Sequence, residues 1–593
     1  MNSVPFSDIT LKNGFWSDKQ QLNRETVLWA VYNRFKETGR IDSMDCQTYY
    51  EDLSIAWGSD VFKWIEGAAY VYRLHPDEKI ISAIRNIVND VKDGTREDGY
   101  YNSYFNNPRI TKPRFTDRNA HELYSLGHMI EAGIAVYETF GDDTLLNLCK
   151  RGADLVYRIF FKENSAAFVT PGHEEIELAL VRLYRATQEQ RYLELAEFFV
   201  RQRGNNVKDQ PIRSDFVEVD QSHLPITQQT TAEGHAVRAV YLYCAIADLA
   251  KDLQDDSLFQ TAETLFSDIY EHKAYITGGI GSTKDGEAFI RPYYLPNATA
   301  YTETCAALGL ALFCRRMYAL KPDGRYGDLA ERALYNGMLS GLSLDGTSFF
   351  YTNPLEIDLD RQGVRGIPAR ITQRKKVFGC SCCPPNLVRL LPSLADFLYT
   401  YDDRYLYVHQ YMANVGTVDG CHIEVKTAYP QDGGVAVAYN GNRNVALRRP
   451  AWCQEIKADA VYVEKDGYLY FDSSAVSVEF VMQPLFYQAS THVHENVGKV
   501  ALMRGPIVYC LEEQDQPYPL ASLRVNPASA VTVCKESFGG LPKLQTDGIA
   551  VSQSTPLYHP VCDEHTACPL TFIPYYAFAN RSESAMKVWI DRL

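Results

Sequence analysis

Apolar residues recur three and four positions apart from about residue 19 to residue 400, and Gly, Pro, Asn or Asp closes each stretch. This spacing places the apolar side chains on one face of a helix. It predicts helices at Leu22–Phe35, Ala56–Tyr72, Ile80–Val91, Ala120–Phe140, Thr144–Phe160, His173–Thr187, Arg191–Arg201, Ala232–Ala250, Leu258–His272, Thr299–Tyr318, Gly327–Leu339 and Pro385–Tyr399. An even number of successive helices favours six hairpins that close into an (α/α)6 barrel. An open α-solenoid is the alternative, although the sequence shows no fixed repeat period.

The pattern changes after about Tyr401, where short runs alternate apolar and polar residues. Val476 to Met482 is one such run, and turn pairs such as Asp432-Gly433 separate the runs. The sequence therefore predicts an (α/α)6 barrel followed by two β-sandwich domains. We expect an N-terminal strand within 1–12 that packs on the β region, the barrel at 13–403, β-sandwiches at 404–497 and 498–575, and a C-terminal strand within 576–593 that returns to the first sandwich.

Charge narrows the range of partners. The chain has 59 Lys and Arg against 74 Asp and Glu, a formal net charge of −15, which disfavours nucleic acid and anionic membranes as partners. No apolar stretch approaches the ~20 residues that span a bilayer. Met1 to Trp16 lacks the basic and apolar segments of a secretory signal, so we expect a cytoplasmic protein. Its 14 cysteines should then be mostly thiols, which favours metal or catalytic roles.

Three cysteines within four residues are the strongest chemical signal: Cys380, Cys382 and Cys383, followed by two prolines. Prolines here predict a helix start, where free backbone N–H groups favour a thiolate. Glu303 and Cys305, at another predicted helix start, can turn toward the same ion. Together Glu303, Cys305, Cys382 and Cys383 would give one oxygen and three sulfur ligands in a tetrahedron, which suits zinc. A purely structural metal clip, or buried free cysteines, is the alternative.

A glycine-rich loop, Gly278 to Ser282, lies upstream of Glu303 and is followed by Glu287. The loop is not a phosphate site, because no strand precedes it and no Lys-Ser or Lys-Thr follows. Near an anionic metal–thiolate group the pKa of Glu287 would rise, so that this carboxyl could act as a general acid. A solvated loop carboxylate is the alternative.

Histidines stand at three predicted helix starts, His121, His173 and His235. Because helix N-termini of an (α/α)6 barrel gather around one mouth, these imidazoles could hydrogen-bond the hydroxyls of one sugar. Packing inside the core is the alternative for each of them. We interpret His128, further along its helix, as a packing residue.

At these segments the sequence resembles glycoside hydrolase family 127, whose described members are β-L-arabinofuranosidases. The matching segments run along the whole chain: Ser59–Trp64, His121–Tyr124, Gly172–Leu180, Gly234–Arg238, Thr277–Ser282, Gly286-Glu287, Leu295–Asn297, Glu303–Ala306, Phe378–Pro384, Met503–Pro506 and Pro574–Tyr576. The segment Thr38 to Tyr50, around Arg40, departs from the family pattern, which leaves the range of sugars open.

The resemblance implies an (α/α)6 barrel with β-sandwich domains, a bound zinc ion and a retaining mechanism. By position, Cys382 resembles the family's nucleophile and Glu287 its acid/base. The implied zinc ligands are Glu303, Cys305, Cys382 and Cys383, and the implied sugar contacts are His121, His173, His235 and Tyr351.

These features together predict a retaining exo-glycoside hydrolase that releases β-L-arabinofuranose from short oligosaccharides, with zinc as its cofactor. The same mechanism on another pectin-derived sugar is one alternative, and a zinc-stapled sugar-binding protein without catalysis is another. Exposed strand edges in the β domains could pair two copies into a homodimer.

Overall fold

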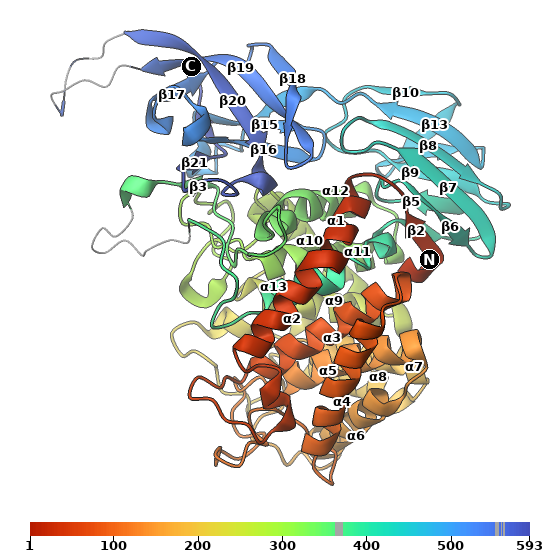
Figure 1. Cartoon of the computed structure of the whole chain (residues 1–593). Helices are drawn as coiled ribbons and strands as arrows, with labels where there is room; N and C mark the ends of the chain where they lie inside the picture. The colour runs from red at the N-terminus through yellow and green to blue at the C-terminus, as the bar shows by residue number, and fades with distance from the viewer. Residues whose placement is uncertain (362–371, 552–556, 559, 561–563) are drawn as a thin grey trace.

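A computed structural model describes residues 1–361, 372–551, 557–558, 560 and 564–593. The gaps fall within the expected helical domain and within the expected second β domain. A helical domain forms the N-terminal part, and β-rich domains follow it, drawn above the helices in Figure 1. Within the described residues, we find no helix that combines the length and apolar character needed to cross a bilayer.

Six helices of the N-terminal part form a closed ring in which each contacts the next and the last contacts the first. They are α3 (Trp57–Leu74), α5 (Glu122–Phe140), α7 (Ile176–Thr187), α9 (Ala236–Asp252), α11 (Thr304–Leu320) and α13 (Cys383–Leu390). In α3 every residue from Trp57 to Val71 is buried, as expected for a helix enclosed by neighbours on all sides.

A second set of helices packs outside this ring, each against the ring helix that it precedes or follows in the sequence. It comprises α2 (Leu28–Glu37), α4 (Glu78–Gly94), α6 (Thr144–Val156), α8 (Gln190–Gln202), α10 (Asp256–Asp268) and α12 (Gly324–Arg332). The first helix, α1 (Phe15–Leu22), packs instead on the helical turn Asn23–Val27 that leads into α2. In α4 the buried residues are apolar and follow helical spacing, from Ile80 to Val91, so this helix has one core face and one solvent face.

The last expected helix is shorter than its apolar pattern suggested. We expected it to reach Tyr399, but α13 ends at Leu390, and Tyr399 begins strand β4 (Tyr399–Tyr401). Pro392 lies between them, and a proline cannot donate the next helical hydrogen bond.

Two six-stranded sheets follow the helical domain. One has the order β1 (Asn2–Ser3), β4, β5 (Tyr405–Val408), β9 (Asn444–Arg448), β12 (Tyr468–Phe471) and β11 (Tyr462–Lys465). The other has the order β10 (Ile456–Ala458), β13 (Ala475–Phe480), β8 (Gly434–Tyr439), β7 (Cys421–Thr427), β6 (Asn414–Val418) and β2 (Ile9–Leu11). The N-terminal strands thus pair here, β1 with β4 and β2 with β6.

A third, ten-stranded sheet ends the chain. Its path is β14 (Pro484–Tyr487), β15 (Lys499–Arg504), β16 (Ile507–Glu512), β20 (His565–Pro574), β19 (Leu541–Val551) and β17 (Leu523–Val525), joined by β18 (Val531–Phe538), β3 (Glu356–Ile357), β21 (Met586–Lys587) and β22 (Ile590–Asp591).

Two expected boundaries of this region are wrong. The third sheet begins at β14, before the expected boundary at 498, because β14 pairs with β15. The C-terminal strand within 576–593 does not return to the first β domain: β21 pairs with β16 and β3, and β22 pairs with β15. Met586, Val588 and Trp589 are buried in an apolar cluster that these pairings create with the third sheet and the loop around Phe350.

Candidate active site

Two helix starts bring the four expected metal ligands together. Glu303 precedes the first turn of α11, and Cys382 precedes that of α13, which has prolines at its first positions. Cys305 Sγ lies 3.5 Å from Cys382 Sγ and 3.2 Å from Cys383 Sγ. Glu303 Oε1 lies 3.4 Å and 3.6 Å from the same two sulfurs. Cys380, the third cysteine of this segment, is exposed and outside the cluster.

These distances fit a tetrahedral zinc ion. Zinc with sulfur at about 2.3 Å and oxygen at about 2.0 Å places its ligand atoms roughly 3.5 to 3.8 Å apart. Burial, and then the charges of Cys382 and Glu287, raise the pKa of Glu303 well above its ordinary value, and a bound cation would reverse this shift. The donor set therefore suits a thiophilic divalent ion.

Two further residues support the cluster, and our sequence analysis missed both. Asn386 Nδ2 donates to Cys305 Sγ at 3.1 Å, and Arg389 Nε donates to Asn386 Oδ1 at 2.7 Å. Asn386 stands three positions after Cys383 on α13, so helical spacing puts both on one face. That spacing was the available signal.

Charged side chains of four ring helices pair with one another inside the ring, next to Asn386 and the cluster. Arg389 Nη1 lies 2.9 Å from Glu66 and 2.6 Å from Glu131, and Arg182 Nη1 lies 3.0 Å from Glu66. His128, which we interpreted as a packing residue, is fully buried beside this group. These ion pairs from α3, α5, α7 and α13 form a floor under the site.

A cavity of about 430 Å³ opens on the other side of the cluster. Its lining includes the candidate catalytic and sugar-contacting residues together: His121, His173, His235, Glu287, Glu303, Cys305, Tyr351 and Cys382. Cys383 is buried behind them. Asp60, from the Ser59–Trp64 segment, also lines the cavity, as does Arg238.

His121 and His173 have the same tautomer, with Nε2 free to accept a hydrogen bond. His121 Nδ1 is 2.8 Å from the carbonyl oxygen of Asn119, and His173 Nδ1 is 3.1 Å from that of Glu174. A carbonyl only accepts, so each Nδ1 carries the proton and each Nε2 is left as an acceptor. Burial lowers the pKa of His121 to about 4 and that of His173 well below its ordinary value. Both rings are therefore neutral acceptors for hydroxyl groups at neutral pH.

His235 has the opposite tautomer and contacts Glu287. Its Nδ1 accepts from the Val237 N–H at 3.2 Å, so Nε2 carries the proton and donates to Glu287 Oε2 at 2.9 Å. Tyr301 donates to Glu287 Oε1 at 3.0 Å, and Tyr351 donates to Oε2 at 3.3 Å. Sequence reasoning missed Tyr301, although it stands only two residues before Glu303.

The pKa of Glu287 lies below its ordinary value. Burial raises it, but the hydrogen bonds from His235 and from the two tyrosine hydroxyls outweigh burial. The prediction of a raised pKa is therefore wrong, because it considered the thiolates and not these donors. Glu287 and His121 also have left-handed backbones, with φ of 53° and 57°, which is uncommon outside glycine and typical of functional sites.

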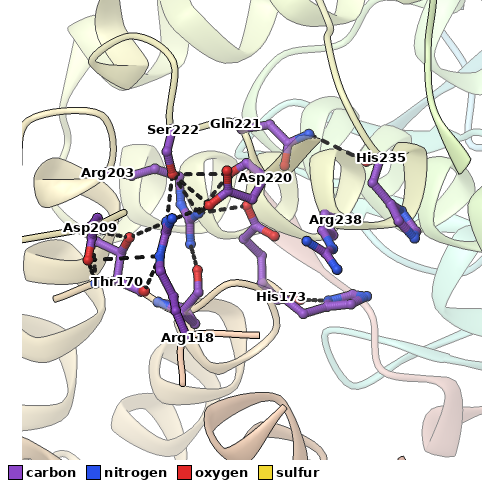
Figure 2. Close-up of polar contacts among 12 residues, drawn as sticks. Arg118, Thr170, His173, Arg203, Asp209, Asp220, Gln221, Ser222, His235 and Arg238 are labelled. Carbon is purple, nitrogen blue, oxygen red and sulfur yellow. Dashed lines mark hydrogen bonds and ion pairs between the residues drawn. The ribbon is translucent and has the colours of Figure 1, made fainter. Parts of the chain in front are cut away.

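Buried ion pairs hold the loop before His235 (Figure 2). Arg118 Nη2 lies 2.5 Å from Asp220 Oδ2, and Arg203 Nη1 donates to the Asp220 carbonyl at 2.8 Å. Gln221, the next residue, reaches the His235 carbonyl at 3.4 Å. The charged network thereby fixes the helix start that carries His235.

Arg40, in the segment from Thr38 to Tyr50, holds the cysteine loop. Its Nη2 donates to the carbonyls of Phe378 and Gly379, each at 2.9 Å. Its Nε lies 3.5 Å from Asp60. Arg40 therefore links α3 to the segment that leads into Cys382.

Two family models and one curated protein match this chain, and all three belong to the same kind of enzyme. Residues 8–396 match the family model "Beta-L-arabinofuranosidase, GH127 catalytic domain", and residues 484–591 match the "Glycoside hydrolase family 127 C-terminal domain". The non-reducing end β-L-arabinofuranosidase of Bifidobacterium longum subsp. longum is 31% identical, with 99% of this chain and 100% of that protein covered.

Two solved structures of GH127 enzymes are similar to this chain over nearly its whole length. The crystal structure of Ara127N-Se, a GH127 β-L-arabinofuranosidase from Geobacillus stearothermophilus T6, has a TM-score of 0.93 and 33% identity, covering 99% of this chain and 100% of that one. A second GH127 β-arabinofuranosidase has a TM-score of 0.91 and 33% identity, covering 100% and 98%. The chain described here therefore belongs to glycoside hydrolase family 127 and is a glycoside hydrolase.

Proposed function

We propose that this enzyme is a zinc-dependent, retaining exo-β-L-arabinofuranosidase that acts on short oligosaccharides. The observation that carries the proposal is that Cys382, in a metal-competent cluster, and Glu287 line one cavity with three histidines. The names of its relatives support the choice of sugar.

Glu303, Cys305, Cys382 and Cys383 would hold the zinc ion. When bound, zinc supplies a positive charge that favours ionised thiols near neutral pH. The neutral Nε2 atoms of His121 and His173 accept hydrogen bonds from sugar hydroxyls and orient the ring.

The reaction then proceeds in two displacements. The sulfur of Cys382 attacks the anomeric carbon while the bond to the leaving oxygen breaks, and Glu287 gives its proton to that oxygen. A water molecule next attacks the same carbon, Glu287 takes the water's proton, and the carbon–sulfur bond breaks. Two inversions retain the configuration of the sugar.

The architecture that we propose is an (α/α)6 barrel with β-sandwich domains. Its support is the ring of α3, α5, α7, α9, α11 and α13 with the other helices outside it. Strands β13 and β8 bury every second residue, as strands with one core face do.

The test is release of p-nitrophenol from p-nitrophenyl β-L-arabinofuranoside by reduced, zinc-loaded enzyme. We expect turnover that Cys382→Ser abolishes. We expect Glu287→Gln to lower kcat/KM at least 100-fold on a methyl glycoside, whose leaving group needs a proton. Glu287→Gln keeps all four metal ligands, so its zinc content should equal that of the wild type.

Nuclear magnetic resonance of the first-formed sugar should show the β anomer, as retention requires. A first-formed α anomer would exclude the Cys382 nucleophile. Absence of turnover from a folded, zinc-containing sample would point instead to another pectin-derived sugar in the same cavity.

A further inference from the structure

A cavity of about 730 Å³ lies at the junction of the helical domain and the first β domain. Its walls come from Lys321 and Pro322, which directly follow α11, from the β4–β5 turn with β5, and from β11 and β12. A neighbouring cavity of about 350 Å³ lies beside it at the β11–β12 turn, and Asp466 lines both. We call the two cavities together the junction groove. Clefts between domains are a preferred location of ligand-binding sites.

The junction groove lies at the far end of α11 from the metal cluster. Glu303 precedes the first residue of α11, whereas Lys321 follows its last, and the helix has 17 residues. At about 1.5 Å per residue, the helix separates Glu303 from Lys321 by roughly 25 Å. The groove also shares no lining residue with the sugar cavity. A ligand in the groove would therefore leave the sugar cavity open.

Strand register places tyrosines on one wall of the groove. Tyr407 of β5 pairs with Ala446 of β9, which pairs with Tyr470 of β12. Residues in register share a face of the sheet, and the ring centroids of Tyr407 and Tyr470 are 6.1 Å apart. Tyr405, two positions before Tyr407, lies on the same face, 5.0 Å from the ring of Tyr470. Val463, in register with Tyr470 and 67% exposed, extends this apolar wall.

Charged groups of both signs stand beside the aromatic wall. The larger cavity is lined by four carboxylates and three cations: Asp402, Asp403, Asp466, Asp472, Lys321, Arg404 and Lys465. Since these charges nearly cancel, the groove favours neither a polyanion nor a polycation. Hydroxyl groups both donate and accept hydrogen bonds, so a neutral polyhydroxyl ligand can pair with both kinds of side chain.

One of these carboxylates is fixed by three donors. Tyr407, which is only 4% exposed, donates to Asp402 Oδ2 at 3.0 Å. The backbone N–H groups of Arg404 and Tyr405 donate to Asp402 Oδ1 at 2.8 Å and 2.7 Å. A carboxylate oxygen has two lone pairs, so Oδ2 can accept a further hydrogen bond from a ligand. Because Asp402 is already ordered, a ligand need not meet the entropic cost of fixing it.

We propose that the junction groove is a second glycan-binding site and holds a neutral oligosaccharide chain. Sugar rings have apolar C–H faces and polar edges. The faces pack on Tyr405, Tyr470 and Val463, and the hydroxyl groups pair with the charged side chains. Two adjoining cavities accommodate a chain of several sugars better than a single one. The site would anchor the enzyme to a glycan while the sugar cavity stays free, and binding there requires no catalytic residue.

Isothermal titration calorimetry tests the site with neutral oligosaccharides built from arabinose, galactose or xylose, and with an oligogalacturonate as the anionic counterpart. Tyr470→Ala removes a ring from the wall, and Val463→Glu adds a charge at an exposed position that leaves the core intact. Tyr518→Ala is the matched control, because Tyr518 is 38% exposed and lines neither cavity of the groove. Glu287→Gln is the control for the sugar cavity.

We expect a neutral oligosaccharide to bind the wild type, and each groove variant to lower its affinity about tenfold. Tyr518→Ala and Glu287→Gln should retain the affinity of the groove. Absence of binding by all the neutral oligosaccharides, tighter binding of the oligogalacturonate, or unchanged affinity in both groove variants would overturn the site.

Sedimentation velocity tests the other occupant, a second copy of the chain. A sedimentation coefficient that falls in Val463→Glu and not in Tyr518→Ala would assign the groove to a dimer interface and overturn the glycan site. Failure of the proposed function is distinguishable from these results. A wild type that binds a neutral oligosaccharide through the groove but hydrolyses no β-L-arabinofuranoside would contradict the proposed function and leave the groove standing.

Discussion

At the scale of the residue, the charge of Glu287 is set by the donors around it. Three side chains donate to its carboxylate, and they keep its pKa low in spite of burial. Protonation of the leaving oxygen needs the acid form, and the fraction of acid form falls as pH rises above the pKa. For a poor leaving group, kcat/KM should therefore decline with rising pH.

Substitution of Tyr301 tests this dependence. Tyr301→Phe removes the donor to Oε1 and keeps the ring, so the pKa of Glu287 should rise and the declining limb of kcat/KM should move to higher pH. The measurement is a pH profile with methyl β-L-arabinofuranoside. Tyr294→Phe is the control. Tyr294 lines the same cavity of about 610 Å³ as Tyr301, but it is not among the three donors to Glu287. A limb that stays in place in Tyr301→Phe would exclude Tyr301 as a determinant of this pKa.

Substitution of Asn386 should weaken zinc binding as well as the reaction. Asn386→Leu removes the N–H donor to Cys305, and loss of such a supporting contact typically weakens metal binding about 10- to 100-fold. Transfer of zinc to a chromogenic chelator measures the change directly. Asn23→Leu is the control, because Asn23 is also buried and donates to the Val388 carbonyl of α13 without touching a thiol. Equal zinc retention in both variants would contradict this role.

The sequence pointed to the four candidate metal ligands, whereas it gave little sign of the side chains that contact them. Cysteine spacing pointed to the cluster whose ligand atoms the structure brings within 4.8 Å of one another. Asn386 shares a helix face with Cys383, but its contact with Cys305, like that of Tyr301 with Glu287, depends on which neighbour that part of the chain meets. The pKa of Glu287 was predicted in the wrong direction for the same reason, since His235 is 52 positions away in the sequence but within hydrogen-bond distance.

At the scale of the element, α13 and α3 approach each other closely at Gly67. A Cβ at this position would lie 2.6 Å from Val388 Cγ1 and 2.8 Å from the Arg389 backbone nitrogen. The glycine therefore determines how closely α13, the helix that carries Cys383, can approach α3.

Gly67→Ala should destabilise the protein in spite of alanine's better helix propensity. Overpacking typically lowers the free energy of unfolding by about 1–3 kcal/mol. The better helix propensity of alanine raises it by roughly 1 kcal/mol or less, so the net effect should be destabilising. We expect a lower urea midpoint and faster loss of zinc, because α13 must move. Gly434→Ala in β8 is the control, since its Cβ would meet only Asp432 Oδ1 at 3.4 Å. An unchanged midpoint in Gly67→Ala would show that the helices can separate freely.

Helical spacing predicted the ring helices, and strand alternation predicted the change to β structure. The end of α13 was missed because apolar residues continue past Leu390 into β4, and a short apolar run fits a helix or a strand equally. Very short strands such as β21 and β22 carry too few residues for a pattern, so their partners are defined only by packing.

At the scale of the whole molecule, a buried arginine joins the β region to the helices. Arg448 of β9 is fully buried, lies 2.6 Å from Glu331 and also pairs with Asp328, both in α12. Loss of the arginine would leave two carboxylates inside the interface without a cation.

Arg448→Met should thus lower the free energy of unfolding by about 3–5 kcal/mol, measured as a lower urea midpoint. Arg449→Met is the matched control, because the neighbouring Arg449 pairs with Glu464 at a solvent-exposed site, where ion pairs contribute about 1 kcal/mol or less. Similar midpoints for the two variants would exclude Arg448 as a structural link between the domains.

The charged floor of the ring also determines by which route substrate enters and product leaves the site. Glu66, Glu131, Arg182 and Arg389 pair with one another inside the ring, near the cysteine cluster, so a glycan that extended inward from the sugar cavity would meet these paired charges. In the proposed reaction a chain end enters the sugar cavity, and the freed monosaccharide leaves through the same opening. Accumulating monosaccharide should therefore compete with incoming chain ends, which makes the enzyme sensitive to how fast its surroundings clear the product.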